Sequence, residues 1–177
     1  MELKGSRTEG NLMGAFDGES MAHMKYMFYG EVAQREGFEQ MAAIFRETAM
    51  NEQQHAKLWF VALKHLGHTP ENLAAAKGGE HYEWTQMYKE YEQVAREEGF
   101  TDIADAFREV AEVEEEHEKR FTALINNLEN KQVFSRPEPR RWQCRNCGYI
   151  HEGTEAPLVC PACKYPQGYY QLMMDNY

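Results

Sequence analysis

Two kinds of potential metal ligand recur in the sequence at fixed spacing. Two Cys-x-x-Cys turns, separated by twelve residues, contain all the cysteines of the chain, which are Cys144, Cys147, Cys160 and Cys163. Two such turns can bring four thiolates together in a tetrahedral site, and this spacing is typical of zinc as well as of iron. Cysteines confined to one short segment also favour a metal site in a reducing compartment over a disulfide framework.

The second kind of ligand is a Glu-x-x-His motif that occurs twice, as Glu52 with His55 and as Glu114 with His117. Both motifs lie on the apolar stripe of an amphipathic pattern, where packing would favour Leu or Ala. Three more glutamates lie on the apolar lines of other helical patterns, namely Glu19, Glu80 and Glu83. Burying so many like charges is costly unless cations compensate them, so the pattern predicts bound metal.

The residue types indicate which metal. Carboxylates that can bridge, with one imidazole on each side, suit a pair of iron or manganese ions better than structural zinc or calcium. A Glu from each of two helices, with Glu-x-x-His from each of two others, is the pattern of di-iron carboxylate bundles. The alternative is a set of solvated acids beside two surface histidines, which the duplication of the motif on the apolar stripe disfavours.

The elements that position these ligands are duplicated. Residues 37–57 align with residues 99–119 at a constant offset of 62. The apolar spacing predicts helices over 11–36, 38–66, 79–98 and 100–129. Four helices in two equivalent pairs predict an all-α four-helix bundle over 1–130. Residues 131–141 predict an extended linker, and 142–177 predict a separate module whose folding depends on its metal.

The repeat is not exact. Glu19 aligns with Glu80 at an offset of 61, whereas Tyr26 aligns with Tyr88 at an offset of 62. The third helix therefore contains one more residue than the first between these positions. A helix can absorb one added residue as a π-bulge, a feature often found at functional sites. We therefore predict a π-bulge between Glu80 and Tyr88.

Other polar residues leave alternatives open. His23 is either a ligand or a partner of one, or a hydrogen-bonded core or surface histidine. The hydroxyls of Tyr26 and Tyr88 either bond to ligand carboxylates or belong to an aromatic core. The remaining acids of the fourth helix predict a charged surface or its border, and they are Glu112, Glu115, Glu116 and Glu118.

Composition excludes some classes of function. The formal net charge of -10 and the lack of a basic stripe argue against nucleic-acid binding. No segment has the apolar length of a membrane span, and the N-terminus lacks the apolar region of a signal peptide. We expect a soluble cytoplasmic protein that contacts no membrane.

The whole chain resembles rubrerythrin. The resemblance rests on GESMAHMKY at 18–26, the two Glu-x-x-His motifs, GEHYEW at 79–84, and CRNCGY with CPAC. It implies a ferritin-like di-iron bundle followed by a small β-rich rubredoxin-like domain. By the same resemblance Glu52 and Glu114 bridge the irons, Glu19 binds one iron, and Glu80 with His117 binds the other. Glu83 and His55 would exchange at the first iron on reduction.

The resemblance also implies a function. We expect a non-haem di-iron peroxidase that reduces hydrogen peroxide to water in oxidative stress defence. Electrons would come through a rubredoxin-type Fe(Cys)4 centre from an external donor, either rubredoxin or an NAD(P)H-dependent reductase. We expect a homodimer or larger homo-oligomer. The alternatives are a ferroxidase or iron-handling protein, and an adaptor with structural zinc and a metal-free bundle.

Overall fold

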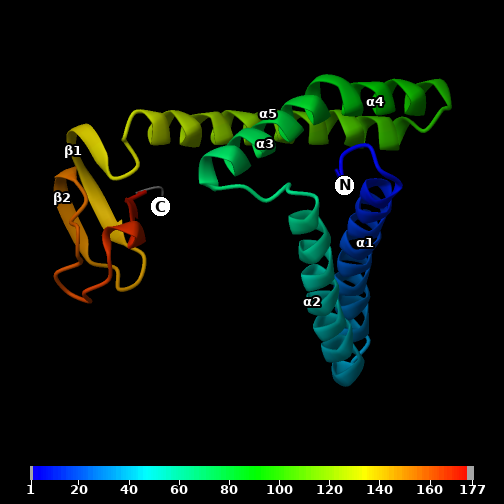
Figure 1. Cartoon of the computed structure of the whole chain (residues 1–177), viewed down its shortest axis with the longest axis horizontal. Coiled ribbons are helices and arrows are strands. Elements are labelled where there is room, and N and C mark those ends of the chain that lie inside the picture. The colour runs from blue at the N-terminus through cyan, green and yellow to red at the C-terminus, as the bar shows by residue number, and fades with distance from the viewer. Residues whose placement is uncertain (1, 175–177) are drawn as a thin grey trace. The chain divides into compact units, whose positions relative to one another are not determined.

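The computed structural model describes residues 2–174 (Figure 1). The chain divides into two compact units, Met1–His68 and Thr69–Tyr177. The first unit is a pair of helices. The second contains the other helices, followed by a small sheet. The predicted combination of an all-α part with a small β-rich C-terminal part is confirmed, whereas the predicted domain boundaries at 130 and 142 stay a prediction.

The first unit is a hairpin of two long helices, α1 (Arg7–Arg35) and α2 (Glu39–Ala62). The Ser6 hydroxyl accepts a hydrogen bond from the backbone N–H of Glu9 at 3.1 Å and caps the start of α1. The residues that the hairpin buries most deeply are small, apart from one leucine: Gly30, Ala33, Ala42, Ala49, Ala56 and Leu63. Small side chains let the two helices approach closely, so the interior of the hairpin is thin.

The helices of the second unit pack as another antiparallel pair. α3 (Thr69–Tyr82), the π-helical segment η1 (Glu83–Met87) and α4 (Tyr88–Glu97) follow one another without a break and pack against α5 (Thr101–Glu129) (Figure 1). The π-helical segment lies between Glu80 and Tyr88, where the repeat has its extra residue. The predicted π-bulge is therefore confirmed.

Several helix ends differ from the prediction. α3 begins at Thr69 rather than at 79, because Pro70 fits the first turn of a helix and does not end one there. α2 ends at Ala62 rather than at 66. Two residues after this end, Lys64 adopts a left-handed φ of 60°. The backbone N–H of His65 then bonds to the carbonyl of Phe60 at 3.1 Å, which closes the end of the helix. α1 also starts earlier than expected, at Arg7.

The C-terminal part is a three-stranded antiparallel sheet in the order β2-β1-β3, formed by β1 (Ser135–Cys144), β2 (Ile150–Glu155) and β3 (Tyr170–Leu172). A short 3-10 turn, η2 (Gln167–Tyr169), precedes β3. The core of this C-terminal part consists of Trp142, Cys144, Ala156, Cys160 and Tyr170. This core has few apolar side chains, in agreement with a module that needs its metal to fold.

Residues 135–141, which the sequence predicts as part of an extended linker, are extended and belong to β1. They include two prolines, which cannot donate to a sheet. Pro137 and Pro139 lie where the register between β1 and β2 shifts, between Ser135 and Arg140, so their missing donors disturb no regular pairing.

As for membranes, no helix within residues 2–174 has the length and apolar character needed to cross one.

Candidate metal centres

The first ligand group lies on the α1–α2 hairpin. Glu19 of α1 meets Glu52 and His55 of α2, and one ligand atom of each lies within 4.8 Å of the others. The Nδ1 atom of His55 is 2.9 Å from Glu52 Oε2 and 3.7 Å from Glu19 Oε2. Two carboxylates and one imidazole thus point at one place, in a geometry that a single cation could occupy.

The second ligand group has the same composition and nearly the same geometry. Glu80 of α3 meets Glu114 and His117 of α5, again within 4.8 Å. The Nδ1 atom of His117 is 2.6 Å from Glu114 Oε2 and 3.6 Å from Glu80 Oε2. The duplication seen in the sequence is therefore present in the side-chain geometry, and six of the seven predicted ligands form two matched groups of three.

Burial raises the pKa of Glu80 above its ordinary value of 4.5, and the hydrogen bond that its protonated form donates to Glu114 and the charge of that neighbour raise it further. A carboxyl whose pKa is raised by folding stabilises the fold while it is protonated and loses this contribution as the pH rises through its folded pKa. We therefore expect metal-free protein to become less stable as the pH rises above about 4.5.

Thermal unfolding of metal-free protein across this pH range would measure the effect. Glu80→Gln should make the melting temperature depend less on pH. Glu116 offers a matched control of opposite sign, because Lys119 holds its pKa below the usual range through a hydrogen bond and an opposite charge. Glu116→Gln should leave the destabilisation at rising pH in place. An unchanged pH profile in Glu80→Gln would contradict the assignment.

Glu83, the seventh predicted ligand, is not a member of either group. It is the first residue of the π-helical segment, so the extra residue and the extra carboxylate occur at the same point of the helix. Its charge contributes to the raised pKa of Glu80 and to that of Tyr88. Glu83 therefore lies near the second group without sharing its compact geometry.

The two equivalent tyrosines lie in aromatic clusters of the same design. Tyr26 packs against Phe45 at a ring distance of 6.2 Å, and Tyr88 packs against Phe107 at 6.0 Å. Burial raises the pKa of Tyr88, and the carboxylates of Glu83 and Glu114 raise it further. Tyr88 thus belongs to an aromatic core and also lies within the electrostatic influence of the ligands.

The four cysteines converge at the end of the sheet. Cys144 Sγ is 3.7 Å from Cys163 Sγ, and Cys147 Sγ is 3.7 Å from Cys160 Sγ. Metal–sulfur bonds of about 2.3 Å in a tetrahedron would separate the sulfurs by about 3.8 Å, so the cage has the size that a metal requires. Although burial opposes ionisation, a hydrogen bond from the backbone of Cys163 lowers the pKa of Cys160 to about 6.

One polar cluster beside the second group escaped the sequence analysis. Glu118 accepts a hydrogen bond from Trp84 Nε1 at 2.6 Å and pairs with His81 Nδ1 at 3.0 Å. Glu118 is half-buried at the border of the predicted charged surface, where its carboxylate joins α5 to α3 and to the π-helical segment. The predicted charged surface is confirmed for Glu115 and Glu116, which pair with Lys119. The GEHYEW motif contained both partners, but the sequence does not show which α5 carboxylate they meet.

We expect Glu118→Ala to loosen the π-helical segment, since Trp84 loses its acceptor and His81 loses its hydrogen-bond partner. Amide hydrogen exchange should become faster in Glu83–Met87, and the melting temperature should fall. Glu118→Gln keeps an acceptor for Trp84 and should have the smaller effect. Equal exchange rates in wild type and Glu118→Ala would show that the segment does not depend on this contact.

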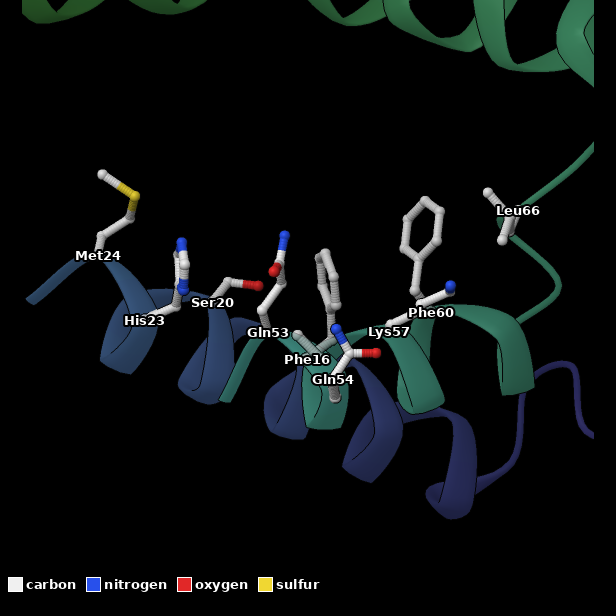
Figure 2. Close-up of a pocket in the computed structure, with 10 residues that line it drawn as sticks. Phe16, Ser20, His23, Met24, Gln53, Gln54, Lys57, Phe60 and Leu66 are labelled. Atoms are coloured by element: carbon white, nitrogen blue, oxygen red, sulfur yellow. The ribbon is translucent and has the colours of Figure 1, made fainter. Parts of the chain in front are cut away.

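His23 lies outside the ligand groups. Its Nδ1 donates to the carbonyl of Ala49 at 2.7 Å, which confirms the reading of a hydrogen-bonded histidine. Figure 2 shows its ring beside Ser20 and Gln53, in a row that continues to Phe60 along a groove of about 570 Å³ on the α1–α2 hairpin. None of the ligands Glu19, Glu52 and His55 lines this groove.

Comparison with known proteins agrees with this arrangement. Residues 10–125 match a family model described as Rubrerythrin, and 142–171 match one described as Rubrerythrin, rubredoxin-like domain. A rubrerythrin of Porphyromonas gingivalis is 46% identical, over 99% of this chain and 94% of the relative. A rubrerythrin of Nitratidesulfovibrio vulgaris is 44% identical, over 99% of this chain and 98% of the relative.

Among solved structures, nigerythrin in a partially reduced state is 28% identical, covers 95% of this chain and 87% of that chain, and has a TM-score of 0.37. The carboxylate and histidine groups fit the two irons of a di-iron centre, and the four cysteines fit one iron in a tetrahedral sulfur site. Two matched regions and relatives that align over nearly the whole chain lead to one conclusion. The chain belongs to the rubrerythrin family.

Proposed function

We propose that this chain is a hydrogen peroxide reductase, which converts one H2O2, two electrons and two protons into two molecules of water. The observation that carries the proposal is the pair of matched ligand groups, each with two glutamates and one histidine, in a chain that also holds a four-cysteine site. The family is generally one of oxidoreductases, and both features suit a reaction that consumes electrons.

We assign seven residues to the di-iron site, and they are Glu19, Glu52, His55, Glu80, Glu83, Glu114 and His117. Glu52 and Glu114 would bridge the metals, and the other residues would each bind one of them. Glu83 and His55 would alternate as ligands of one iron. When bound, the irons supply two electrons at one place and stabilise the charge that develops on the departing oxygens.

One side chain near the second group can hold a proton for the reaction. The Tyr88 hydroxyl stays protonated at neutral pH, because burial and the nearby carboxylates raise its pKa. Water formation consumes protons, so a donor held beside the reacting oxygens would assist it.

The four-cysteine site would pass electrons one at a time to the di-iron site. We propose rubredoxin or an NAD(P)H-dependent reductase as the external donor, in the cytoplasm and as part of oxidative stress defence. The corresponding division of the chain is a di-iron domain over 1–130, a connection over 131–141 and a rubredoxin-like domain over 142–177.

The test compares two reactions of the same preparation. Chemically reduced protein is mixed without air with hydrogen peroxide, and separately with oxygen in the presence of added ferrous iron. Faster peroxide consumption supports the proposal, whereas faster ferrous oxidation supports a ferroxidase. Metal analysis of the purified protein precedes both measurements. A protein that contains one zinc and no iron would overturn the redox assignment.

A further inference from the structure

The side chain of Tyr170 is buried, but its hydroxyl has no partner. Tyr170 begins β3 and is 4% exposed. Among residues 2–174, no atom forms a hydrogen bond with this hydroxyl. Most buried polar side-chain atoms in folded proteins have a partner, so an unpaired hydroxyl requires an explanation. A phenylalanine would keep the same ring in this core and would leave no donor unsatisfied.

The unpaired hydroxyl lies beside the four-cysteine site. Tyr170 is directly opposite Cys144 in the pairing of β1 with β3, so the two side chains leave the sheet on the same face. On that face they share one core with Trp142 and Cys160. Burial raises the pKa of Tyr170, and the sulfurs of Cys160 and Cys144 raise it further, so the hydroxyl lies within the electrostatic influence of both.

The cysteines differ in which donors can reach their sulfurs. Cys147 is exposed, so water can donate hydrogen bonds to its thiolate. Cys160 is fully buried, and the backbone of Cys163 donates one hydrogen bond to it. A buried charge is stable only when nearby donors replace the water that it has lost. A bound metal keeps its cysteine ligands deprotonated, so it turns Cys160 into the charged acceptor that Tyr170 lacks.

We propose that the Tyr170 hydroxyl donates a hydrogen bond to the Cys160 thiolate when iron occupies the four-cysteine site, and that this bond raises the reduction potential of the iron. Ferric iron takes up one electron to become ferrous, and the ferrous site carries one more negative charge. A hydrogen-bond donor therefore stabilises the ferrous form more than the ferric form. Tyr170 acts through Cys160 and does not bind the metal. The inference rests on the proposed electron transfer through this site.

Tyr170→Phe tests the bond by removing a single oxygen atom. The visible absorption of the ferric four-cysteine site is followed in the full-length, iron-loaded protein at controlled electrode potentials. At a fixed potential the ratio of ferrous to ferric iron should fall about tenfold, which is about 59 mV for one electron. The sulfur-to-iron charge-transfer band should also move to longer wavelength, because a thiolate without this donor gives up its electrons more easily.

Tyr169→Phe is the matched control, because it removes the same atom from the adjacent residue, whose side chain is 42% exposed. Its potential and absorption band should stay at the wild-type values. A Tyr170→Phe protein with the wild-type potential, or an equal shift in both variants, overturns the inference and leaves the proposed function intact. A wild-type four-cysteine site without a reversible one-electron step overturns the proposed electron transfer, and this inference with it.

A second measurement needs no substitution at Tyr170. Zinc in place of iron also keeps Cys160 deprotonated, and it leaves the four-cysteine site diamagnetic. A hydroxyl proton held on a buried thiolate should exchange slowly with water, so the full-length wild-type protein should show its resonance by NMR, with Overhauser contacts to the Tyr170 ring. A hydroxyl proton that exchanges too fast to be seen in the zinc-loaded protein overturns the inference, even if Tyr170→Phe does not fold.

Discussion

Glu52→Ala should remove iron from the helical part of the protein and lower peroxide consumption more than about 100-fold. Loss of a residue that supports a ligand already costs about 10- to 100-fold in metal affinity or activity, and loss of a bridging ligand should cost more. Glu52 holds the His55 ring at 2.9 Å, so the histidine would also lose its orientation. Iron analysis and stopped-flow measurement of peroxide would follow both effects.

Glu116→Ala is the matched control, because it removes a glutamate that is 67% exposed and pairs only at the surface with Lys119. Iron content and peroxide consumption should stay at wild-type levels. The fold should survive Glu52→Ala, since the change removes a charge from beside Glu19 and leaves the buried alanines in place. Full iron content in Glu52→Ala would contradict its assignment as a ligand.

Cys160→Ser should unfold the C-terminal sheet and leave the helices folded. The core of the sheet contains only a few apolar side chains beside its cysteines, and Cys160 is fully buried there. Metal binding by small domains contributes an apparent free energy of about 10–16 kcal/mol, more than such a core supplies. The variant should therefore expose Trp142, which is fully buried in the wild type.

Tryptophan emission and amide exchange over residues 142–172 would report the loss, while far-ultraviolet circular dichroism should keep its helical signal. Tyr165→Phe offers a control at a 40% exposed position of the same module. In peroxide assays, Cys160→Ser should stop turnover that is driven by an external donor. Iron bound by the helical part and reduced chemically should still carry out a single turnover with peroxide. Sustained donor-driven turnover would show that electrons bypass the four-cysteine site.

The sequence predicted which glutamates and histidines lie close together because their motif occurs twice. One Glu-x-x-His motif by itself is weak evidence for a metal site. The second copy at a constant offset showed which glutamates share a helix stripe with a histidine. The change of offset from 62 to 61 also predicted the π-helical segment. These inferences succeeded because they depend on the periodicity of a single helix, which a repeat makes visible.

Predictions that depended on contacts between elements were weaker. Glu118 looked like its exposed neighbours, and only the packing of α5 beside α3 and the π-helical segment shows that it binds Trp84. Three prolines lie in stretches for which the sequence predicted neither a helix nor a strand, and they are Pro70, Pro137 and Pro139. Pro70 lies in the first turn of α3, and the other two lie at a register shift in β1. Proline restricts a backbone in ways that both a helix start and an irregular strand tolerate.

The π-helical segment breaks the equivalence that the repeat creates. An exact duplication would surround the two metal positions with identical ligands, and neither position could be distinguished from the other. Glu83 begins the segment that holds the extra residue, and Ala22 lies near the corresponding place in α1. In the proposed di-iron site, one inserted residue would thus distinguish the two metal positions, because the carboxylate of Glu83 would lie beside only one of them.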